Sequence, residues 1–133
     1  MSFPEPPDGP RRDTGSFRDP SGHVYLDGDR IIRVLYERGH EAWTALENST
    51  LFDTFTSDRR LIGTREIPVA DISEAGWAAA LQHNRIPVIT YPYEWSFGML
   101  KDAALLTLDL LAAALEEDLV LKDATPFNVQ FDG

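Results

Sequence analysis

The chain has 133 residues, of which 43% are hydrophobic and 26% charged, a composition typical of one soluble globular domain. Its 12 basic and 22 acidic residues give a net charge of −10, and such a surface repels phosphate backbones and anionic lipids. We therefore expect no nucleic-acid and no membrane partner. The absence of cysteine excludes disulfides, thiolate nucleophiles and cysteine-based zinc sites, and it suits a cytoplasmic protein.

The first part of the chain predicts a tail and a hairpin. Residues 1–20 contain five prolines and few side chains to bury, which predicts a flexible tail ahead of a single α+β domain at residues 21–133. Within that domain, β-prone runs at 23–26 and 30–35 flank Asp27-Gly28-Asp29. Asp-Gly between such runs predicts a β-hairpin, although the three-residue connection leaves the turn type open.

Helical and extended patterns then alternate along the chain. Apolar and aromatic residues at three- and four-residue spacing predict a helix at 36–48, and a second short helix follows at 51–57. The segment Asp71-Ile72-Ser73-Glu74 resembles a capping box and predicts a helix that runs to about His83. Strands are predicted at 60–67, at 86–91, where the strand is expected to be central or nearly so, at 119–121 and at 128–131.

Residues 96–117 predict one long helix whose second half is apolar on nearly every side. A helix without a polar face needs partners all around, so we expect part of its cover to come from missing chain or a partner subunit. The chain stops at Asp132-Gly133, a turn signal with nothing after it, which predicts a cut C-terminus. The order of elements predicts an α+β fold with a small antiparallel sheet and several helices, and a kinase-like N-lobe fragment is one interpretation of it.

Glycine and histidine spacing argue against cofactor and metal binding by this chain. An adenosyl cofactor on a Rossmann-like sheet requires a glycine-rich turn, because the backbone must approach the ligand closely. The nine glycines are scattered and no two have G-x-G spacing, so we expect no cofactor-binding residue and no Walker-type phosphate loop. His23, His40 and His83 lack metal-ligand spacing, so no metal site is expected.

One loop carries residues with the spacing of a phosphotransfer site. Asp123 and Asn128 are five positions apart between two apolar segments, and Lys122 precedes them. In protein kinases and aminoglycoside kinases an aspartate at this spacing acts as the base and an asparagine binds magnesium, so Mg²⁺ and ATP are the ligands of this alternative. A structural role is equally open, with Asp123 capping the turn and Asn128 bonded to the loop backbone. The chain shows no glycine-rich loop over phosphates and no later magnesium-binding aspartate motif.

Three blocks together resemble a known family: residues 15–22, residues 86–97 with 100–108, and residues 121–131. The family is that of bacterial class I S-adenosylmethionine-dependent methyltransferases, including relatives of rhizobial nodulation proteins. The resemblance covers roughly residues 15–131 and is poor over 51–85. It implies an N-terminal accessory domain, because the family's S-adenosylmethionine-binding fold lies downstream of these blocks. The implied partner is a C-terminal methyltransferase domain or a partner subunit.

The segment Tyr91-Pro92-Tyr93-Glu94-Trp95 is the candidate for substrate binding or docking. Aromatic rings beside a carboxylate suit a recognition surface for a small-molecule substrate or for a partner domain. A packed corner between a strand and a helix is the favoured explanation of the same residues, because aromatic side chains chiefly contribute buried surface. Three functions therefore stay open: an accessory methyltransferase domain that is inactive alone, a small-molecule phosphotransferase lobe, and a non-enzymatic interaction module.

Overall fold

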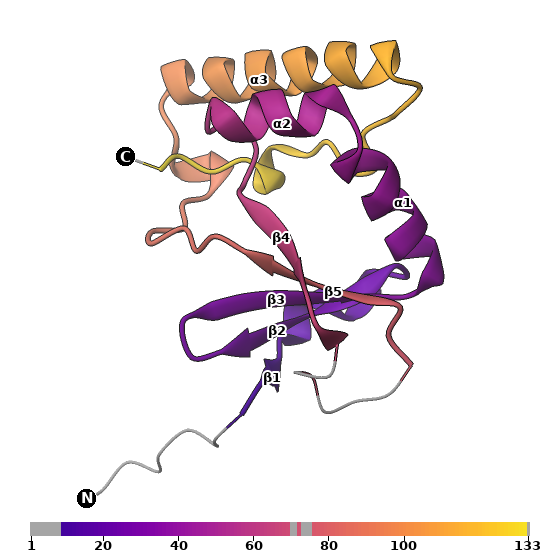
Figure 1. The fold of residues 1–133 in the computed structure, drawn as a ribbon. Helices are drawn as coiled ribbons and strands as arrows, with labels where there is room; N and C mark the ends of the chain where they lie inside the picture. Colours follow the sequence, from indigo (N-terminus) through magenta and orange to yellow (C-terminus); the bar gives the residue numbers. More distant parts are fainter. Residues whose placement is uncertain (1–8, 70–71, 73–75, 133) are drawn as a thin grey trace, which may run out of the picture. The chain divides into compact units, whose positions relative to one another are not determined.

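A computed structural model of the chain describes residues 9–69, 72 and 76–132 and has an α+β fold. The described part divides into two compact units. The sheet unit comprises Met1–Ala42 and Gly63–Arg85, and the helical unit comprises Trp43–Ile62 and Ile86–Gly133. The elements in chain order, labelled in Figure 1 where there is room, are β1 (Arg11–Arg12), η1 (Thr14–Arg18), β2 (Gly22–Asp27), β3 (Arg30–Leu35), α1 (Glu37–Glu47), α2 (Thr50–Ser57), β4 (Thr64–Ile67), β5 (Ala79–His83), η3 (Pro92–Glu94), α3 (Phe97–Glu116) and η4 (Pro126–Asn128).

The sheet unit is a five-stranded antiparallel sheet with the strand order β1-β2-β3-β5-β4. The predicted hairpin of β2 and β3 is confirmed, with Asp27 opposite Arg30. Two residues, Gly28 and Asp29, therefore form the connection instead of the predicted three. Gly28 has a φ of +57° and Asp29 has a negative φ, which is the pattern of a type II′ turn with glycine at its first central position.

The core of the sheet unit lies on one face of the sheet. Ile32 and Val34 of β3 are fully buried, and their cross-strand neighbours Tyr25 and Ala80 lie on the same face. Burying the side chains of Ile32 and Val34 stabilises the fold by roughly 1.5–3 kcal/mol each. The other members of this cluster are Ile67 and Ile72, with Val69 and Trp77 packed against them.

The helix that was predicted to run to about His83 is wrong over its last residues, which form the strand β5. Residues 70, 71 and 73–75 lie outside the described residues, so the predicted capping box is not described, but Ala79–His83 is a strand. β5 bonds to β3 on one side and to β4 on the other, and Ala79, Ala80 and Leu81 are all buried. Backbone pairing on both sides outweighs the helix propensity of the alanines, and this strand takes a central position in the sheet.

The segment 86–91 was predicted to be that central strand, and this prediction was wrong. It contains no strand, and Val88 and Ile89 are exposed. Pro87 lacks the N–H that a central strand must donate, which explains why an apolar run here does not pair. The strands predicted at 119–121 and 128–131 are also absent, and β4 occupies only the second half of the strand predicted at 60–67.

The predicted tail at 1–20 is structured in its second half. Residues 1–8 lie outside the described residues, whereas Arg11 and Arg12 pair with Leu26 and Tyr25 of β2. Asp13 caps the 3-10 helix η1 by accepting a hydrogen bond from the N–H of Gly15. The proline content misled the prediction, because the ordering cost of 11–18 is offset by sheet pairing and side-chain contacts.

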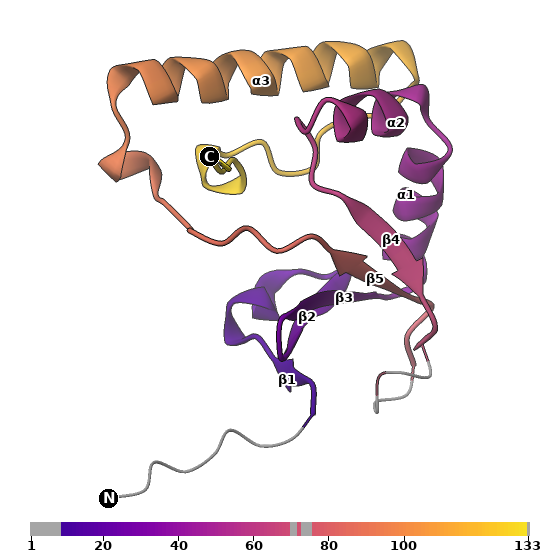
Figure 2. The same ribbon diagram turned by 60° about the vertical axis from the view of Figure 1, so that its left-hand side comes forward.

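The predicted helices at 36–48, 51–57 and 96–117 are confirmed by α1, α2 and α3. In the helical unit, α2 and α3 lie side by side (Figures 1 and 2). Leu51 and Phe55 of α2 pack with Ala114 of α3 in the core of this unit. The partly buried members of the cluster are Leu46, Leu61, Leu106, Leu110, Ala113 and Leu119. None of the helices in the described part of the chain combines the length and apolarity that a membrane span requires.

Candidate functional site

The loop in which a phosphotransfer site was one prediction is held by a bond from a side chain to its own backbone. The side-chain Nδ2 of Asn128 donates to the carbonyl oxygen of Asp123 at 2.7 Å, and η4 begins after Thr125. Asn128 therefore bonds to the main chain of Asp123 and fixes the loop. Lys122 and Asp123 are exposed neighbours of this contact. Among the described residues, no three histidine, aspartate or glutamate side chains gather as metal ligands would.

The aromatic segment 91–95 forms a corner between the preceding segment, residues 84–90, and α3. Trp95 is buried, and its Nε1 donates to Oγ1 of Thr90 at 2.9 Å. The ring of Phe131 meets the Trp95 ring edge to face, with centroids 5.1 Å apart. Trp95 thus fixes this loop-to-helix corner by packing, and its buried ring is not presented for binding.

Gln130 holds the same corner from the C-terminal segment. Its Oε1 accepts from the N–H of Thr90 at 2.9 Å, and its Nε2 donates to the Thr90 carbonyl at 3.0 Å. One amide side chain therefore satisfies both backbone groups of Thr90 in the way that a neighbouring strand would. Sequence reasoning missed Gln130, because a glutamine beside an apolar run has no motif that distinguishes it.

Tyr91 and Tyr93 form the exposed part of the corner. Their rings are stacked, with centroids 5.4 Å apart and planes 5° from parallel, and Tyr93 is 76% exposed. Glu94 lies between them and Trp95, and its Oε2 accepts from the N–H of Tyr91 at 2.9 Å. The corner therefore presents two preordered aromatic rings beside a carboxylate, which suits contacts with an apolar or cationic group.

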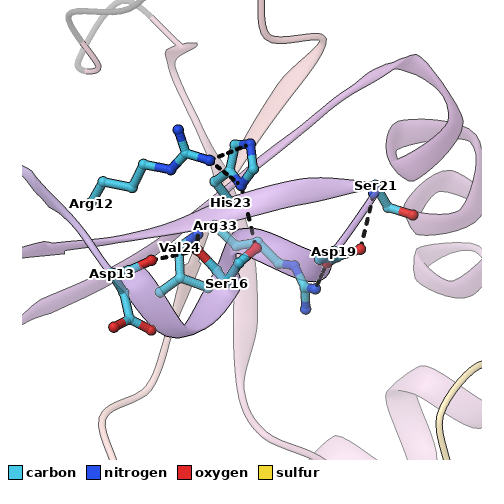
Figure 3. A network of polar contacts seen from close by, with 8 residues as sticks. All are labelled: Arg12, Asp13, Ser16, Asp19, Ser21, His23, Val24 and Arg33. Atoms are coloured by element: carbon cyan, nitrogen blue, oxygen red, sulfur yellow. Dashed lines mark hydrogen bonds and ion pairs between the residues drawn. The ribbon is translucent and has the colours of Figure 1, made fainter.

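A second polar arrangement lies in the sheet unit and was not predicted. His23 of β2 is only 8% exposed. Nη2 of Arg12 lies 2.8 Å from its Nε2 and 3.0 Å from its Nδ1 (Figure 3). The Tyr36 hydroxyl lies 3.2 Å from the same Nε2. The ring of Trp77 approaches His23 edge to face at 5.7 Å. Arginine can only donate, so the imidazole accepts from it and thereby ties β1 to β2.

The residues of the first resemblance block continue this network. Oγ of Ser16 donates to the carbonyl of Asp13 at 2.8 Å and accepts from the N–H of Val24 at 3.1 Å. Asp19 accepts from the N–H of Ser21 at 2.9 Å and forms an ion pair with Arg33 (Figure 3). These polar side chains fasten η1 and its flanking loop to the sheet, so the block has a structural role.

His83 lies at the end of β5 beside a cation. Burial, followed by the charge of Arg33, lowers the pKa of His83 to about 4. Its Nδ1 lies 2.8 Å from Oγ1 of Thr64 on the neighbouring strand. The imidazole is therefore neutral at physiological pH and acts as a hydrogen-bonding group within the sheet.

Glu117 follows the last turn of α3 and caps α2. Its carboxylate accepts from the hydroxyl of Thr50 at 2.8 Å and from the N–H groups of Thr50 and Leu51 at 3.0 Å and 2.8 Å. The hydrogen bond from the Thr50 hydroxyl, then those from the backbone, lower the pKa of Glu117. A carboxylate is favoured at this position because the N–H groups at a helix N-terminus lack partners within the helix.

Comparison with known proteins places the chain near a rhizobial nodulation protein. The chain is 39% identical over 126 residues to nodulation protein NoeA of Rhizobium meliloti (strain 1021). The match covers 93% of this chain and 26% of the relative, so the chain spans about a quarter of that protein's length. The predicted relation to rhizobial nodulation proteins is thus supported. No protein-family model and no solved structure matches the chain.

The predicted site residues fall into two places in the helical unit. Lys122, Asp123 and Asn128 belong to the loop around η4, and the aromatic candidates belong to the corner around η3. The structure assigns Trp95 to packing and leaves two tyrosine rings exposed. Within the described residues it adds Gln130 and the His23 contacts, which join residues far apart in the sequence and therefore left no local signal.

Proposed function

We propose that this chain acts as an N-terminal accessory domain of a class I S-adenosylmethionine-dependent methyltransferase. In this role it docks the cofactor-binding domain or shapes the access of a small-molecule substrate, and it transfers no methyl group alone. The observation that carries the proposal is the 39% identity to NoeA over 93% of this chain, which accounts for only 26% of the relative. The remaining length of that relative leaves room for a cofactor-binding domain.

The residues of this chain support an accessory role. S-adenosylmethionine requires a glycine-rich turn at the end of a strand, and no two of the nine glycines have G-x-G spacing. The described sheet is wholly antiparallel, whereas the Rossmann-like fold for such cofactors uses a mostly parallel sheet. The methyl donor is therefore expected to bind outside these residues.

The exposed tyrosine pair supports contact with a substrate or a domain. The Tyr91 and Tyr93 rings stack on each other, Glu94 accepts from the N–H of Tyr91, and the adjacent Thr90 is held by Trp95 and Gln130. The rings are therefore expected to lose little freedom on binding. We infer that Tyr91, Tyr93 and Glu94 contact the substrate or the docked domain, while Trp95 positions them. The tyrosine pair is suited to a flat or cationic group, because the faces of the rings carry negative potential.

Calorimetric titration of S-adenosylmethionine tests the proposal in two parallel experiments. The full chain is expected to show no binding, and full-length NoeA is expected to bind under the same conditions. Stoichiometric micromolar binding by the chain would overturn the accessory role, whereas absence of binding by NoeA would overturn the methyltransferase relation. A third titration, with Mg²⁺ and ATP, is expected to give no heat; binding lost in Asp123→Ala would instead establish the phosphotransferase alternative.

A non-enzymatic interaction module is the second candidate, and one specific observation favours it. Twelve of the thirteen exposed large apolar side chains among the described residues belong to the helical unit. An exposed apolar surface of this kind is typical of a protein–protein contact. Both the accessory role and the interaction module require an exposed apolar contact surface. The S-adenosylmethionine titration of NoeA separates them, because only the accessory role requires that NoeA bind the cofactor.

A further inference from the structure

α3 exposes apolar side chains on the side opposite its packed side. Leu106, Leu110 and Ala114 pack in the core of the helical unit. The opposite side carries leucines at 105, 108 and 115 that are 48%, 60% and 57% exposed, and Phe97 is 83% exposed. We define the outer stripe of α3 as the exposed residues Phe97, Lys101, Ala104, Leu105, Leu108, Ala112 and Leu115.

The outer stripe has the spacing of a helix-packing surface. Phe97 and Ala104, Leu105 and Ala112, and Leu108 and Leu115 are each seven positions apart. A repeat of seven keeps side chains on one side of a helix, and it is the repeat by which helices pack along one another. The outer stripe therefore fits a second helix lying along α3.

Acidic residues border the outer stripe with the same repeat. Asp102, Asp109 and Glu116 are seven positions apart and exposed. Asp109 also lies 3.3 Å from Nη1 of Arg60, so its charge is partly compensated within the unit. The helical unit as a whole has eleven acidic and four basic side chains, against eleven and eight in the sheet unit.

We propose that the outer stripe of α3 binds an amphipathic helix of a partner, with an apolar side and flanking lysines or arginines. The apolar side would cover the exposed leucines, and the basic flanks would face the acidic row, as charges beside a coiled-coil interface do. A second copy of this chain is disfavoured, because it brings a net charge of −10 of its own. Anionic lipid is disfavoured for the same reason. The inference rests on the docking role in the proposed function and names its surface.

Fluorescence anisotropy with synthetic peptides tests this surface on the full chain. The probe is a labelled amphipathic peptide of about 21 residues with leucines at the core heptad positions and lysines at the flanks. The matched probe has glutamates at the flanks. We expect the lysine peptide to bind and to outcompete the glutamate peptide. Its affinity is expected to fall about tenfold as NaCl is raised from about 50 mM to about 500 mM.

Substitutions locate the binding on the molecule. Leu108→Asn and Leu115→Asn are each expected to weaken the affinity for the lysine peptide by about tenfold, since each removes an apolar contact at the interface. Val120→Asn, at another exposed apolar position, is the matched control and is expected to leave affinity unchanged. Asp102→Asn is expected to weaken binding and reduce its salt dependence, whereas Asp123→Asn is expected to do neither. Circular dichroism establishes that each variant is folded.

Three outcomes would overturn the inference. The first is peptide binding that Leu108→Asn and Leu115→Asn leave unchanged. The second is a dimer in sedimentation that Leu108→Asn dissociates, which would make a second copy the occupant. The third is binding to phosphatidylserine vesicles that the same variants abolish. None of these measurements uses S-adenosylmethionine, so the surface and the methyltransferase relation succeed or fail separately.

Discussion

The sheet unit and the helical unit differ in how they use apolar side chains. In the sheet unit, Ile32, Val34 and Ala80 are fully buried, and Tyr36 is its one exposed large apolar side chain among the described residues. In the helical unit, α3 packs one side and exposes leucines on the other. The described sheet unit therefore exposes little large apolar surface, whereas the helical unit exposes a surface of the kind that typically contacts other proteins.

The two units also differ in their polar contacts. The sheet unit uses Arg12, His23 and Ser16 to fasten its N-terminal segment, which leaves these groups engaged in holding the fold. The helical unit uses Trp95 and Gln130 to hold a corner whose two tyrosine rings stay exposed. Function is therefore expected in the helical unit. Substitutions that are compared by their effect on stability should distinguish the helical unit from the sheet unit.

The largest effect is expected from a matched pair of leucine variants. Leu35→Ala in the sheet unit removes a side chain that is 4% exposed and should lower the free energy of unfolding by about 2–5 kcal/mol, because it leaves a cavity. Leu108→Ala, on the outer stripe of α3, should change it by less than about 0.5 kcal/mol. Urea denaturation measures both. Equal losses would contradict the contrast between the two units.

The next effect is a pH dependence that belongs to the sheet unit. The pKa of His83 is about 4 in the folded protein and 6.5 in the unfolded chain, so the unfolded chain takes up the proton first as the pH falls. The free energy of unfolding should therefore decrease between pH 6.5 and about 4, by on the order of 3 kcal/mol at most, and this contribution should level off below that.

Urea denaturation across this pH range checks the prediction. His83→Asn, which keeps a polar group near Thr64, should flatten the dependence. His40→Asn is the control and should retain it. A slope that survives in His83→Asn would show that His83 is not its source.

A smaller effect is expected at the aromatic corner of the helical unit. Gln130→Ala removes both hydrogen bonds to the backbone of Thr90 and should cost about 1–3 kcal/mol, because two partly buried groups lose their partner. Gln82→Ala, which removes an exposed contact with Arg65, is the matched control and should cost less than about 0.5 kcal/mol. Urea midpoints compare the two, and the same loss in both would refute the role of Gln130.

The smallest effect is expected at the cap of α2. The lowered pKa of Glu117 means that its carboxylate stabilises the fold above its unfolded pKa and loses this contribution as the pH falls through the folded pKa. Glu117→Gln should therefore lower the thermal midpoint at pH 7 and match the parent chain in acid. Glu116→Gln, at the neighbouring exposed position, should leave the midpoint unchanged. A Glu117→Gln midpoint equal to that of the parent chain at pH 7 would refute the cap.

Local signals predicted the hairpin and the three helices, because Asp27-Gly28 and the helical spacing of apolar residues act within a few positions. The same signals failed at Ala79–His83, whose strand depends on partners in β3 and β4 far along the chain. They failed at 86–91 for the converse reason, since an apolar run without a paired neighbour forms no strand. The aromatic corner was predicted as a candidate, but which ring is buried depends on Thr90 and Phe131.

The domain organisation predicted from the sequence, a single α+β domain at residues 21–133, stays a prediction. The described residues group into two compact units, and the first boundary between these units falls within α1, after Ala42. Contact between segments far apart in sequence decides such a division, and a local pattern contains no record of it.

An experimental structure of full-length NoeA with S-adenosylmethionine bound tests the account most directly. We expect the adenosyl group to lie outside the 126 residues that match this chain, and the helix that corresponds to α3 to be covered along its outer stripe. An adenosyl group held within those 126 residues, or a corresponding helix that faces solvent along its length, would contradict the account.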